Sequence, residues 1–204
     1  MKIDLKKDLK HLYAPGARDF VEVEVPPLTY LAIDGHGDPN TSEEYAAAVA
    51  ALYAAAYTIK FASKGAGVDF VVGPLEGLWT SADPASFTAR DKSAWDWTML
   101  IALPDQVAGE VIVQGLSSAA TKKPELPLDR VQTRRIDEGR SLQILHVGSY
   151  DDETPTLARL HGEVMPALGV TWNGPHHEIY LGDPRKSAPD KLKTVLRQPV
   201  KPVS

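Results

Sequence analysis

A glutamate in the middle of a predicted strand is the side chain of this sequence best placed to do chemistry. Residues 176–181 read His-His-Glu-Ile-Tyr-Leu, and strand alternation puts His176, Glu178 and Tyr180 on one face. Glutamate is depleted in strands and is seldom buried alone, so Glu178 needs a partner, a raised pKa or a solvent-filled pocket. Each of these suits a ligand site, and a carboxylate on a solvated sheet face is the alternative.

Tryptophans gather on two neighbouring predicted strands. Trp95 and Trp97 are two residues apart and therefore leave the same face of their strand, and Trp79 ends the preceding strand. Their rings can hold a flat or cationic ligand, or they can simply close the core under a helix. The sequence leaves both possibilities open for each indole.

A stripe of large side chains recurs every four residues along a predicted helix, at Tyr45, Val49, Tyr53, Tyr57 and Phe61. Such a stripe is typical of core packing and is expected to face something apolar. Tyr53 and Tyr57 are the better ligand-binding candidates, because a buried tyrosine hydroxyl needs a partner that Glu178 or a ligand oxygen would supply.

Composition excludes several classes of function. The net charge of −5 repels phosphate backbones, so nucleic acid is not an expected partner. The sequence has no cysteine, which rules out disulfides and thiolate chemistry. The charged N-terminus does not resemble a signal peptide, and no apolar run approaches the roughly 20 residues of a membrane span. We therefore expect a cytoplasmic protein without a membrane partner, of undetermined oligomeric state.

Cofactor and metal motifs are also missing from the sequence. The Gly35-His36-Gly37 turn lacks the rest of a dinucleotide fingerprint, and neither a Walker A pattern nor a Gly-x-Ser-x-Gly elbow occurs. The six histidines have no recognisable metal spacing, since the adjacent His176 and His177 point to opposite faces. We expect no cofactor and no metal site.

The first half of the chain has a β-α-β-β pattern. Strands are predicted at 20–34, with a break at Pro26-Pro27, at 68–79 and at 95–103. Thr41 and Glu44 form a capping box that begins a helix running to about Ser63. A polar loop around Asp83-Pro84 joins the last two strands, and a helix is predicted in 104–121.

The second half repeats the first. A strand-like segment at 131–147 turns near Glu138-Gly139, a short helix begins at Thr154-Pro155, and strands follow at 176–181 and 192–200. Leu28–Asp34 matches Leu142–Gly148, and Asp69–Gly73 matches Glu178–Gly182. Asp69 is thus a weaker counterpart of Glu178.

This duplication predicts an α+β fold, in which two β-α-β-β units form one antiparallel sheet backed by helices, with a ligand cleft between the halves. We expect a single domain over residues 1–204. Its first repeat covers about 20–104, a linker helix about 105–127 and its second repeat about 128–200.

The chain resembles the GyrI-like small-molecule-binding family over nearly its whole length. The resemblance rests on the duplicated plan and on three motifs: Tyr57-Thr-Ile-Lys-Phe61, Trp95-Asp-Trp97, and His176–Arg185 followed by Leu192–Pro199. It is closest to stand-alone members, because the roughly 19 residues before the first strand are too few for a helix-turn-helix.

The resemblance implies a pocket with aromatic walls and a late-strand glutamate, which Glu178 matches, for lipophilic and often cationic compounds. Some stand-alone members hydrolyse cyclopropane rings in flat DNA-alkylating natural products, which makes the chain a candidate detoxifying hydrolase. Glu178 would then deprotonate a water, while Tyr53, Tyr57 or Tyr180 donates to a carbonyl oxygen. The alternatives are a ligand-binding module without catalysis and a modulator of a protein such as gyrase.

Overall fold

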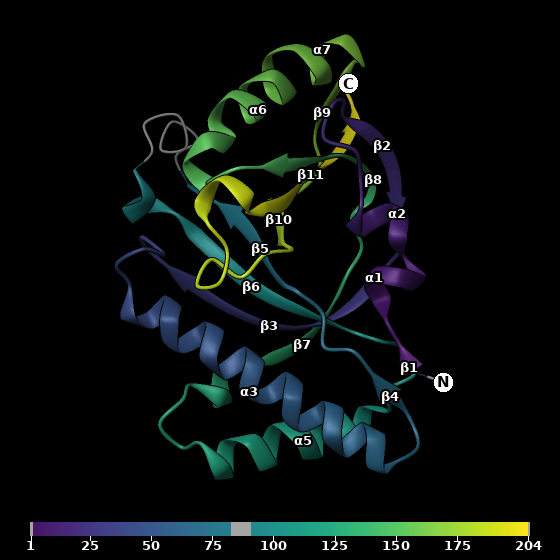
Figure 1. Ribbon diagram of the computed structural model, residues 1–204, viewed down its shortest axis with the longest axis vertical. Helices are drawn as coiled ribbons and strands as arrows, with labels where there is room; N and C mark the ends of the chain where they lie inside the picture. Colours follow the sequence, from purple (N-terminus) through teal and green to yellow (C-terminus); the bar gives the residue numbers. More distant parts are fainter. Residues whose placement is uncertain (1, 83–90, 204) are drawn as a thin grey trace. The chain divides into compact units, whose positions relative to one another are not determined.

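The structure, a computed structural model, describes residues 2–82 and 91–203, which form two compact units. Unit 1 contains Met1–Asp8 and Leu28–Ile136, and unit 2 contains Leu9–Pro27 and Asp137–Ser204. Each unit has an antiparallel sheet and helices, so the predicted α+β class is confirmed (Figure 1). The predicted loop at Asp83-Pro84 lies outside the described residues.

The sheet of unit 1 has the strand order β5-β6-β3-β7, with antiparallel neighbours. Its strands are β3 (Leu28–His36), β5 (Leu75–Thr80), β6 (Asp96–Leu103) and β7 (Gln132–Ile136). Helix α3 (Glu43–Gly65) packs on β3 and β6, and α5 (Gly109–Lys122) packs on α3 (Figure 1). The short elements of unit 1 are β1 (Lys2–Ile3), α1 (Leu5–Asp8), β4 (Asp69–Phe70), η1 (Lys92–Ala94) and η2 (Leu128–Arg130).

Helix α3 begins one residue later than its capping box predicts. Its N-cap is Ser42, whose Oγ accepts a hydrogen bond of 3.1 Å from the backbone N–H of Tyr45. The buried face of the helix is formed by small and aliphatic residues: Ala48, Ala51, Leu52, Ala55, Ala56, Ile59 and Ser63. The predicted aromatic stripe is therefore not the core face, and Tyr57 and Phe61 are exposed.

Close helix packing explains why the alanine face is buried. A Cβ atom at Gly115 of α5 would lie 2.5 Å from Cγ1 of Ile59, so the two helices approach too closely for a large ring between them. The length and apolar content of α3 would also suffice for a membrane span, contrary to expectation. Its packing against two strands and a helix is that of a core helix.

The predicted strand at 68–79 is two strands in the structure. Asp69 belongs to β4, which pairs in parallel with β1, whereas β5 pairs with β6. The Asp69 carboxylate accepts a hydrogen bond of 2.7 Å from Lys60 Nζ, and this ion pair lowers the pKa of Asp69. Asp69 is thus part of a local ion pair, and the prediction that it is the counterpart of Glu178 is wrong.

Trp97 of β6 is packed directly over a glycine. Gly35 of β3 is its cross-strand partner, and a Cβ atom placed on Gly35 would lie 2.0 Å from Cη2 of the indole. The Trp97 Nε1–H donates to the Gly37 carbonyl at 3.3 Å. Gly35 is therefore required by the space that the indole occupies.

The sheet of unit 2 has the strand order β2-β8-β11-β10, and β9 pairs with β11. Its strands are β2 (Val21–Val25), β8 (Gly139–Val147), β9 (Val170–Trp172), β10 (His176–Tyr180) and β11 (Lys193–Pro202). A helical stretch joins β8 to β9: η3 (Tyr150–Glu153), α6 (Thr154–Arg159), the π-helical η4 (Leu160–Val164) and α7 (Met165–Ala167). The other short elements are α2 (Lys10–Tyr13) and η5 (Pro189–Lys191).

Consecutive strands belong to different units at two places in the chain. β2 pairs with β8 in unit 2, yet β3 follows it directly after Pro26-Pro27 and lies in unit 1. The same holds for β7, which pairs with β3, and the following β8. The predicted strand at 20–34 is therefore two strands, because the two prolines interrupt the backbone ladder.

The strand pairing corrects the alignment of the two halves. Leu28 pairs with Ile136, and Gly139 pairs with Val25, so Leu28 and Gly139 begin equivalent strands. The sequence match equates Leu28 with Leu142 instead, because similar apolar strings match at several offsets. The duplication is thus visible in the strand order. The short sequence matches align the two halves at the wrong residues.

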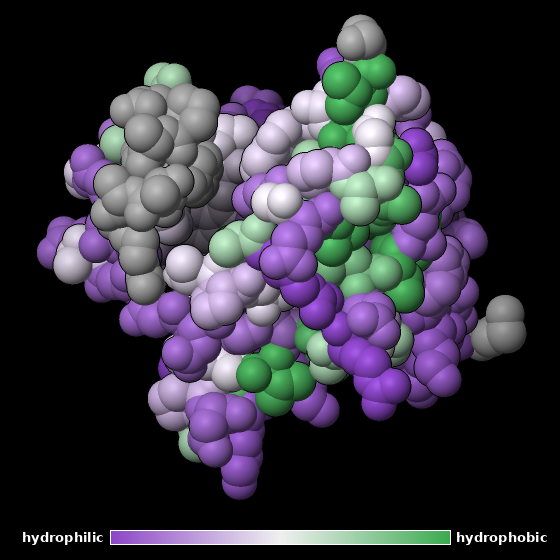
Figure 2. All heavy atoms as spheres, turned by 90° about the horizontal axis from the view of Figure 1, so that it is seen from above, coloured by the Kyte–Doolittle hydropathy of each residue, from purple (hydrophilic) through white to green (hydrophobic). Residues whose placement is uncertain are grey.

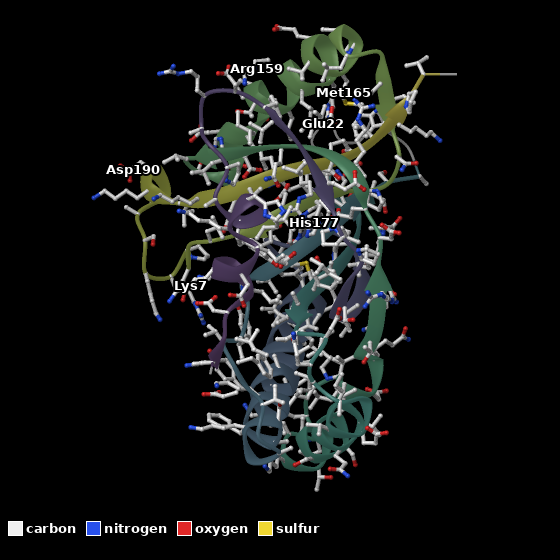
Figure 3. All side chains as sticks on the ribbon, turned by 90° about the vertical axis from the view of Figure 1, so that its right-hand side faces the viewer. Lys7, Glu22, Arg159, Met165, His177 and Asp190 are labelled. Atoms are coloured by element: carbon white, nitrogen blue, oxygen red, sulfur yellow. The ribbon has the colours of Figure 1, made fainter. Side chains whose placement is uncertain are left out.

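A buried guanidinium ties together four segments of unit 2. Arg197 of β11 donates to Glu138 Oε2 at 3.0 Å, to Gln143 Oε1 at 3.1 Å and to the Leu12 carbonyl at 2.9 Å. His177 Nδ1 donates to the other Glu138 oxygen at 2.9 Å, and His177 lies in the interior (Figure 3). This network fixes β10, β11, β8 and the N-terminal segment against one another.

The same network controls the ionisation of Glu138. Burial alone would raise the pKa of Glu138, but the charge and hydrogen bond of His177, with those of Arg197, lower it from 4.5 to about 2. The carboxylate is therefore held ionised. The Glu138 carboxylate therefore contributes to the free energy of unfolding above pH 4.5, and this contribution is lost as the pH falls toward about 2.

We expect acid to destabilise the protein through Glu138. In urea unfolding series, the free energy of unfolding should fall between pH 5 and pH 2 by about 3 kcal/mol more in the wild type than in Glu138→Gln. Glu138→Gln should also be less stable at neutral pH, because it leaves Arg197 without its buried counter-charge. The exposed Glu24→Gln serves as the control and should keep the wild-type pH dependence. If the free energy of unfolding fell equally with pH in Glu138→Gln and in the wild type, the acid dependence could not be assigned to Glu138.

A methyl group at Gly35 should destabilise the fold. Because its Cβ would overlap the Trp97 indole, Gly35→Ala should lower the free energy of unfolding by about 1–3 kcal/mol. Gly109→Ala is the matched control, since nothing lies within 4 Å of its Cβ position at the start of α5. This control should be neutral or stabilising by up to about 1 kcal/mol. A Gly35→Ala protein as stable as wild type would show that the indole can move aside.

Candidate functional site

The candidate carboxylate lies on the face of β10 that strand alternation predicts. His177 and Ile179 are fully buried on one side of the strand, and Glu178 lies on the other with His176 and Tyr180. The Glu178 side chain is 15% exposed. Tyr180 Oη donates to Glu178 Oε2 at 2.8 Å, which orients the carboxylate.

His176 lies beside Glu178 without forming an ion pair. Its Nε2 is 3.7 Å from Glu178 Oε1, and its side chain is 11% exposed. Burial lowers the pKa of His176 to about 3, with further lowering by His161 and His177. His176 is therefore neutral at physiological pH and does not neutralise the charge of Glu178.

A second tyrosine extends this cluster. The Tyr150 ring packs edge-on against the Tyr180 ring, with 5.5 Å between the ring centroids. Burial, followed by the charges of Glu153, Glu178 and Asp183, raises the pKa of Tyr150 to about 12. Tyr150 thus stays protonated in a negative electrostatic environment, which favours a cation nearby.

The candidates of unit 1 form two aromatic pairs. Trp79 and Trp95 pack edge-to-face, with 5.7 Å between ring centroids, and Tyr53 and Tyr57 stack at 6.4 Å. Trp95 lies just before β6, after the 3₁₀ turn η1, and is partly buried. The structure brings each pair together as neighbouring rings of the kind that contact flat ligands.

Trp97 is the most deeply buried of the three predicted tryptophans, although Trp79 is also buried. Trp97 is fully buried, its ring meets the edge of Tyr45 at a centroid distance of 5.2 Å, and its N–H is bonded to the Gly37 carbonyl. These are the contacts of a core residue. A role of Trp97 in ligand binding stays a prediction.

Three residues near these clusters were not predicted as candidates. Glu76 is a fully buried carboxylate in β5, and a glutamate within a predicted strand is the same signal that pointed to Glu178. Tyr150 follows β8 in a short 3₁₀ turn, and His161 lies in the π-helical segment η4. Neither position has a periodic pattern in the sequence that marks it, because both are brought to β10 by tertiary packing.

The geometry does not point to a metal centre. Within residues 2–82 and 91–203, no group of three or more His, Asp or Glu side chains is arranged to hold a metal ion. The chemistry that the unit 2 cluster offers is that of one shielded carboxylate, phenol hydroxyls and a neutral imidazole. Such groups can bind a cation, position a water or accept a proton.

Solved structures with the same fold support this organisation. An uncharacterized conserved protein from Listeria innocua is 43% identical, with a TM-score of 0.89 and coverage of 98% of this chain and 100% of that chain. A hydrolase from Listeria innocua is 42% identical, with the same coverage and a TM-score of 0.85. The EcmrR C-terminal domain has the same fold at 12% identity, with a TM-score of 0.59 over 91% of this chain and 98% of that chain.

A search among curated proteins gives no match. The model of the GyrI-like small molecule binding domain family matches residues 18–201, which is nearly the whole chain. Together with two relatives above 40% identity over 98% of the sequence, this match shows that the chain belongs to the GyrI-like small-molecule-binding domain family.

Proposed function

We propose that this protein binds a lipophilic or aromatic small molecule that carries a positive charge, and that Glu178 supplies the counter-charge. The observation that carries the proposal is the shielded position of the carboxylate. Glu178 is largely shielded, is held by the neutral hydroxyl of Tyr180, and lies next to an imidazole that is uncharged at physiological pH.

Electrostatics favours a cation at this cluster. An ionised carboxylate shielded from water interacts more strongly with a charged ligand than an exposed one does, because the effective dielectric constant is lower. The raised pKa of Tyr150 is a second sign of negative potential, since Glu153, Glu178 and Asp183 all contribute to it. A lipophilic cation would gain both apolar contact and charge compensation.

The aromatic pairs of unit 1 are a second candidate contact surface for a lipophilic ligand. Trp79 with Trp95, and Tyr53 with Tyr57, present ring faces and edges of the kind that stack on flat or cationic groups. We propose that each of these aromatic pairs can contact a flat or cationic group. This part of the proposal is testable by mutation, independently of the role of Glu178.

We expect Glu178→Gln to weaken binding of a cation selectively. The affinity for tetraphenylphosphonium, measured by calorimetry, should fall about 10-fold or more, because the neutral amide cannot compensate the charge. The affinity for triphenylphosphine oxide, a neutral compound of similar shape, should change little. Glu22→Gln, which removes an exposed carboxylate of the same unit, is the matched control. An equal loss for both compounds would show that Glu178 acts through shape rather than charge.

Trp95→Ala tests the aromatic pairs separately from Glu178. The substitution should weaken tetraphenylphosphonium binding, measured by calorimetry, because the ligand loses a ring to pack against. An unchanged affinity in folded Trp95→Ala protein would contradict a role of this pair in ligand binding.

Hydrolysis is a second candidate function, favoured by the 42% identity to a hydrolase from Listeria innocua. We propose as substrate class a cyclopropane fused to a dienone. Glu178 would take a proton from water while the water oxygen forms a bond to a ring CH₂. The breaking C–C bond would send its electrons to the carbonyl oxygen, which takes up the proton and becomes a phenol.

A tyrosine hydroxyl would donate a hydrogen bond to that oxygen as its charge develops. Tyr180 is less suited to this role, because its hydroxyl is engaged with Glu178 at 2.8 Å. In this arrangement Tyr180 positions the base, and the water is the nucleophile. No covalent intermediate with the protein is formed.

Turnover of a cyclopropane-bearing dienone tests the hydrolytic role. Wild-type protein should produce the phenol with one added water, detected by mass spectrometry, and Glu178→Gln should lower the rate at least 100-fold, the scale of general-base catalysis. Tyr180→Phe should retain the product but react more slowly, because the carboxylate loses its orienting donor. Saturable binding of the compound without any product would overturn the enzymatic role and leave the binding role standing.

A further inference from the structure

Helix α3 has a second apolar side, opposite the side that packs in the core. Residues at helical spacing along this second side are exposed or partly exposed, and we call them the outer row: Ala46, Ala50, Ala54, Tyr57 and Phe61. Tyr57 is 50% exposed and Phe61 is 64% exposed. A helix that is apolar on both sides is expected to be covered on both, so a further surface should cover the outer row.

The outer row is continuous along one helix, whereas the exposed apolar residues of unit 2 are distributed over several segments. Leu168 follows α7, Trp172 belongs to β9 and Val203 follows β11. On the face seen in Figure 2, hydrophobic side chains form patches among mostly hydrophilic ones. The outer row instead follows a helix axis for about 22 Å, at a rise of about 1.5 Å per residue. That shape suits contact with another helix.

The rings of the outer row are held in place by other side chains of unit 1. Lys60 Nζ lies 5.7 Å from the centroid of the Phe61 ring, and it donates a hydrogen bond of 2.7 Å to Asp69 Oδ1. The Tyr57 ring stacks on the Tyr53 ring. Side chains that are already fixed lose little conformational entropy on association, so these rings are suited to an interface.

Side-chain size changes along the outer row in a way that fits a second copy of the same helix. The N-terminal part of the row consists of alanines, and the C-terminal part consists of rings. The positions of Ala46 and Phe61 are centred between residues 53 and 54, and so are those of Ala50 and Tyr57. With a two-fold axis at that point, two antiparallel helices place each ring of one copy over an alanine of the other.

The charges at the two ends of α3 have the same symmetry. Glu43 in the first turn and Lys64 in the last turn are exposed, and their positions are also centred between residues 53 and 54. In the antiparallel pair, Glu43 of one copy faces Lys64 of the other at both ends. Opposite charges at the rim of an interface fix its orientation and register more than its affinity. A parallel pair would instead place like charges together and rings against rings.

We propose that the outer row of α3 is a homodimer interface, in which two α3 helices pack antiparallel about a two-fold axis between residues 53 and 54. Tyr57 and Phe61 of each copy pack over the alanines of the other, and two Glu43–Lys64 ion pairs close the ends. One helix per copy lies at the small end of stable interfaces, which bury roughly 1,200–2,000 Å², so the dissociation constant should be micromolar. The dimer covers Tyr57, so ligand contact by the Tyr53–Tyr57 pair is confined to the monomer.

Sedimentation equilibrium measures this association directly. The apparent mass of the wild-type protein should rise with concentration from 22.2 kDa toward twice that value. Phe61→Glu should raise the dissociation constant at least about 10-fold, because each copy loses a ring and gains a charge that faces an alanine. Val203→Glu is the matched control, since Val203 is 61% exposed and lies outside α3, and it should leave the association unchanged.

Cysteine cross-linking tests the register, and the sequence has no cysteine of its own that would react. Ala54→Cys lies next to the two-fold axis, so a short bismaleimide should join two copies. Ala46→Cys lies on the same row, but its two copies would be about 22 Å apart along the helices, too far for the same reagent. A mixture of Ala46→Cys and Phe61→Cys proteins should cross-link with each other, because these positions face one another.

A wild-type protein that keeps the mass of one chain up to about 0.2 mM, far above a micromolar dissociation constant, would overturn the proposal. A dimer that Phe61→Glu does not weaken would overturn it as well, and so would equal self-cross-linking of Ala46→Cys and Ala54→Cys. A monomer that binds phosphatidylcholine vesicles and loses this binding in Phe61→Glu would assign the outer row to a membrane instead, which the length and apolar content of α3 would allow.

Discussion

The buried Arg197 guanidinium is the interaction on which the geometry of unit 2 depends. It donates to Glu138, Gln143 and the Leu12 carbonyl, and through Glu138 it also holds His177. A buried charge is costly unless it is paired and fully hydrogen-bonded, so these partners must stay in place. Because successive strand residues point to opposite faces, anchoring His177 in this network forces His176 and Glu178 to the other side of β10.

Unit 1 is organised by small residues rather than by a buried charge. Alanines on α3 and glycines at positions 35 and 115 let the helices and the Trp97 indole approach closely. Tyr53 stacks with the exposed Tyr57, and Trp79, which is itself buried, meets the partly buried Trp95. Small residues thus occupy the helix interface, and Tyr57 lies at the surface.

Local patterns were sufficient to predict the fold class and the strand face of Glu178. Alternation in His176–Tyr180 is a local property of the backbone, and it holds in the structure.

The prediction that the stripe with Tyr57 and Phe61 faces the core is wrong, because ring size rather than helical period decided which face of α3 packs against β3 and β6. Asp69 failed because a two-residue parallel pairing with β1 was not visible as a pattern. At Pro26-Pro27 the chain passes from β2 of unit 2 to β3 of unit 1. This passage depends on contacts between segments that are far apart in the sequence, which local periodicity does not encode.

The electrostatic character of the candidate site follows from burial combined with partner chemistry, and residue type alone does not determine it. Glu138 and Glu178 are both glutamates on or beside the same sheet, yet one is bound by Arg197 and the other by a tyrosine hydroxyl. The first is compensated within the fold and contributes to stability. The second is held in place by a donor without charge, next to an imidazole that burial keeps neutral. Glu138 is thus tied into the fold by Arg197 and His177, whereas Tyr180 orients Glu178, and this difference in partners separates the structural glutamate from the one that we propose to bind a ligand.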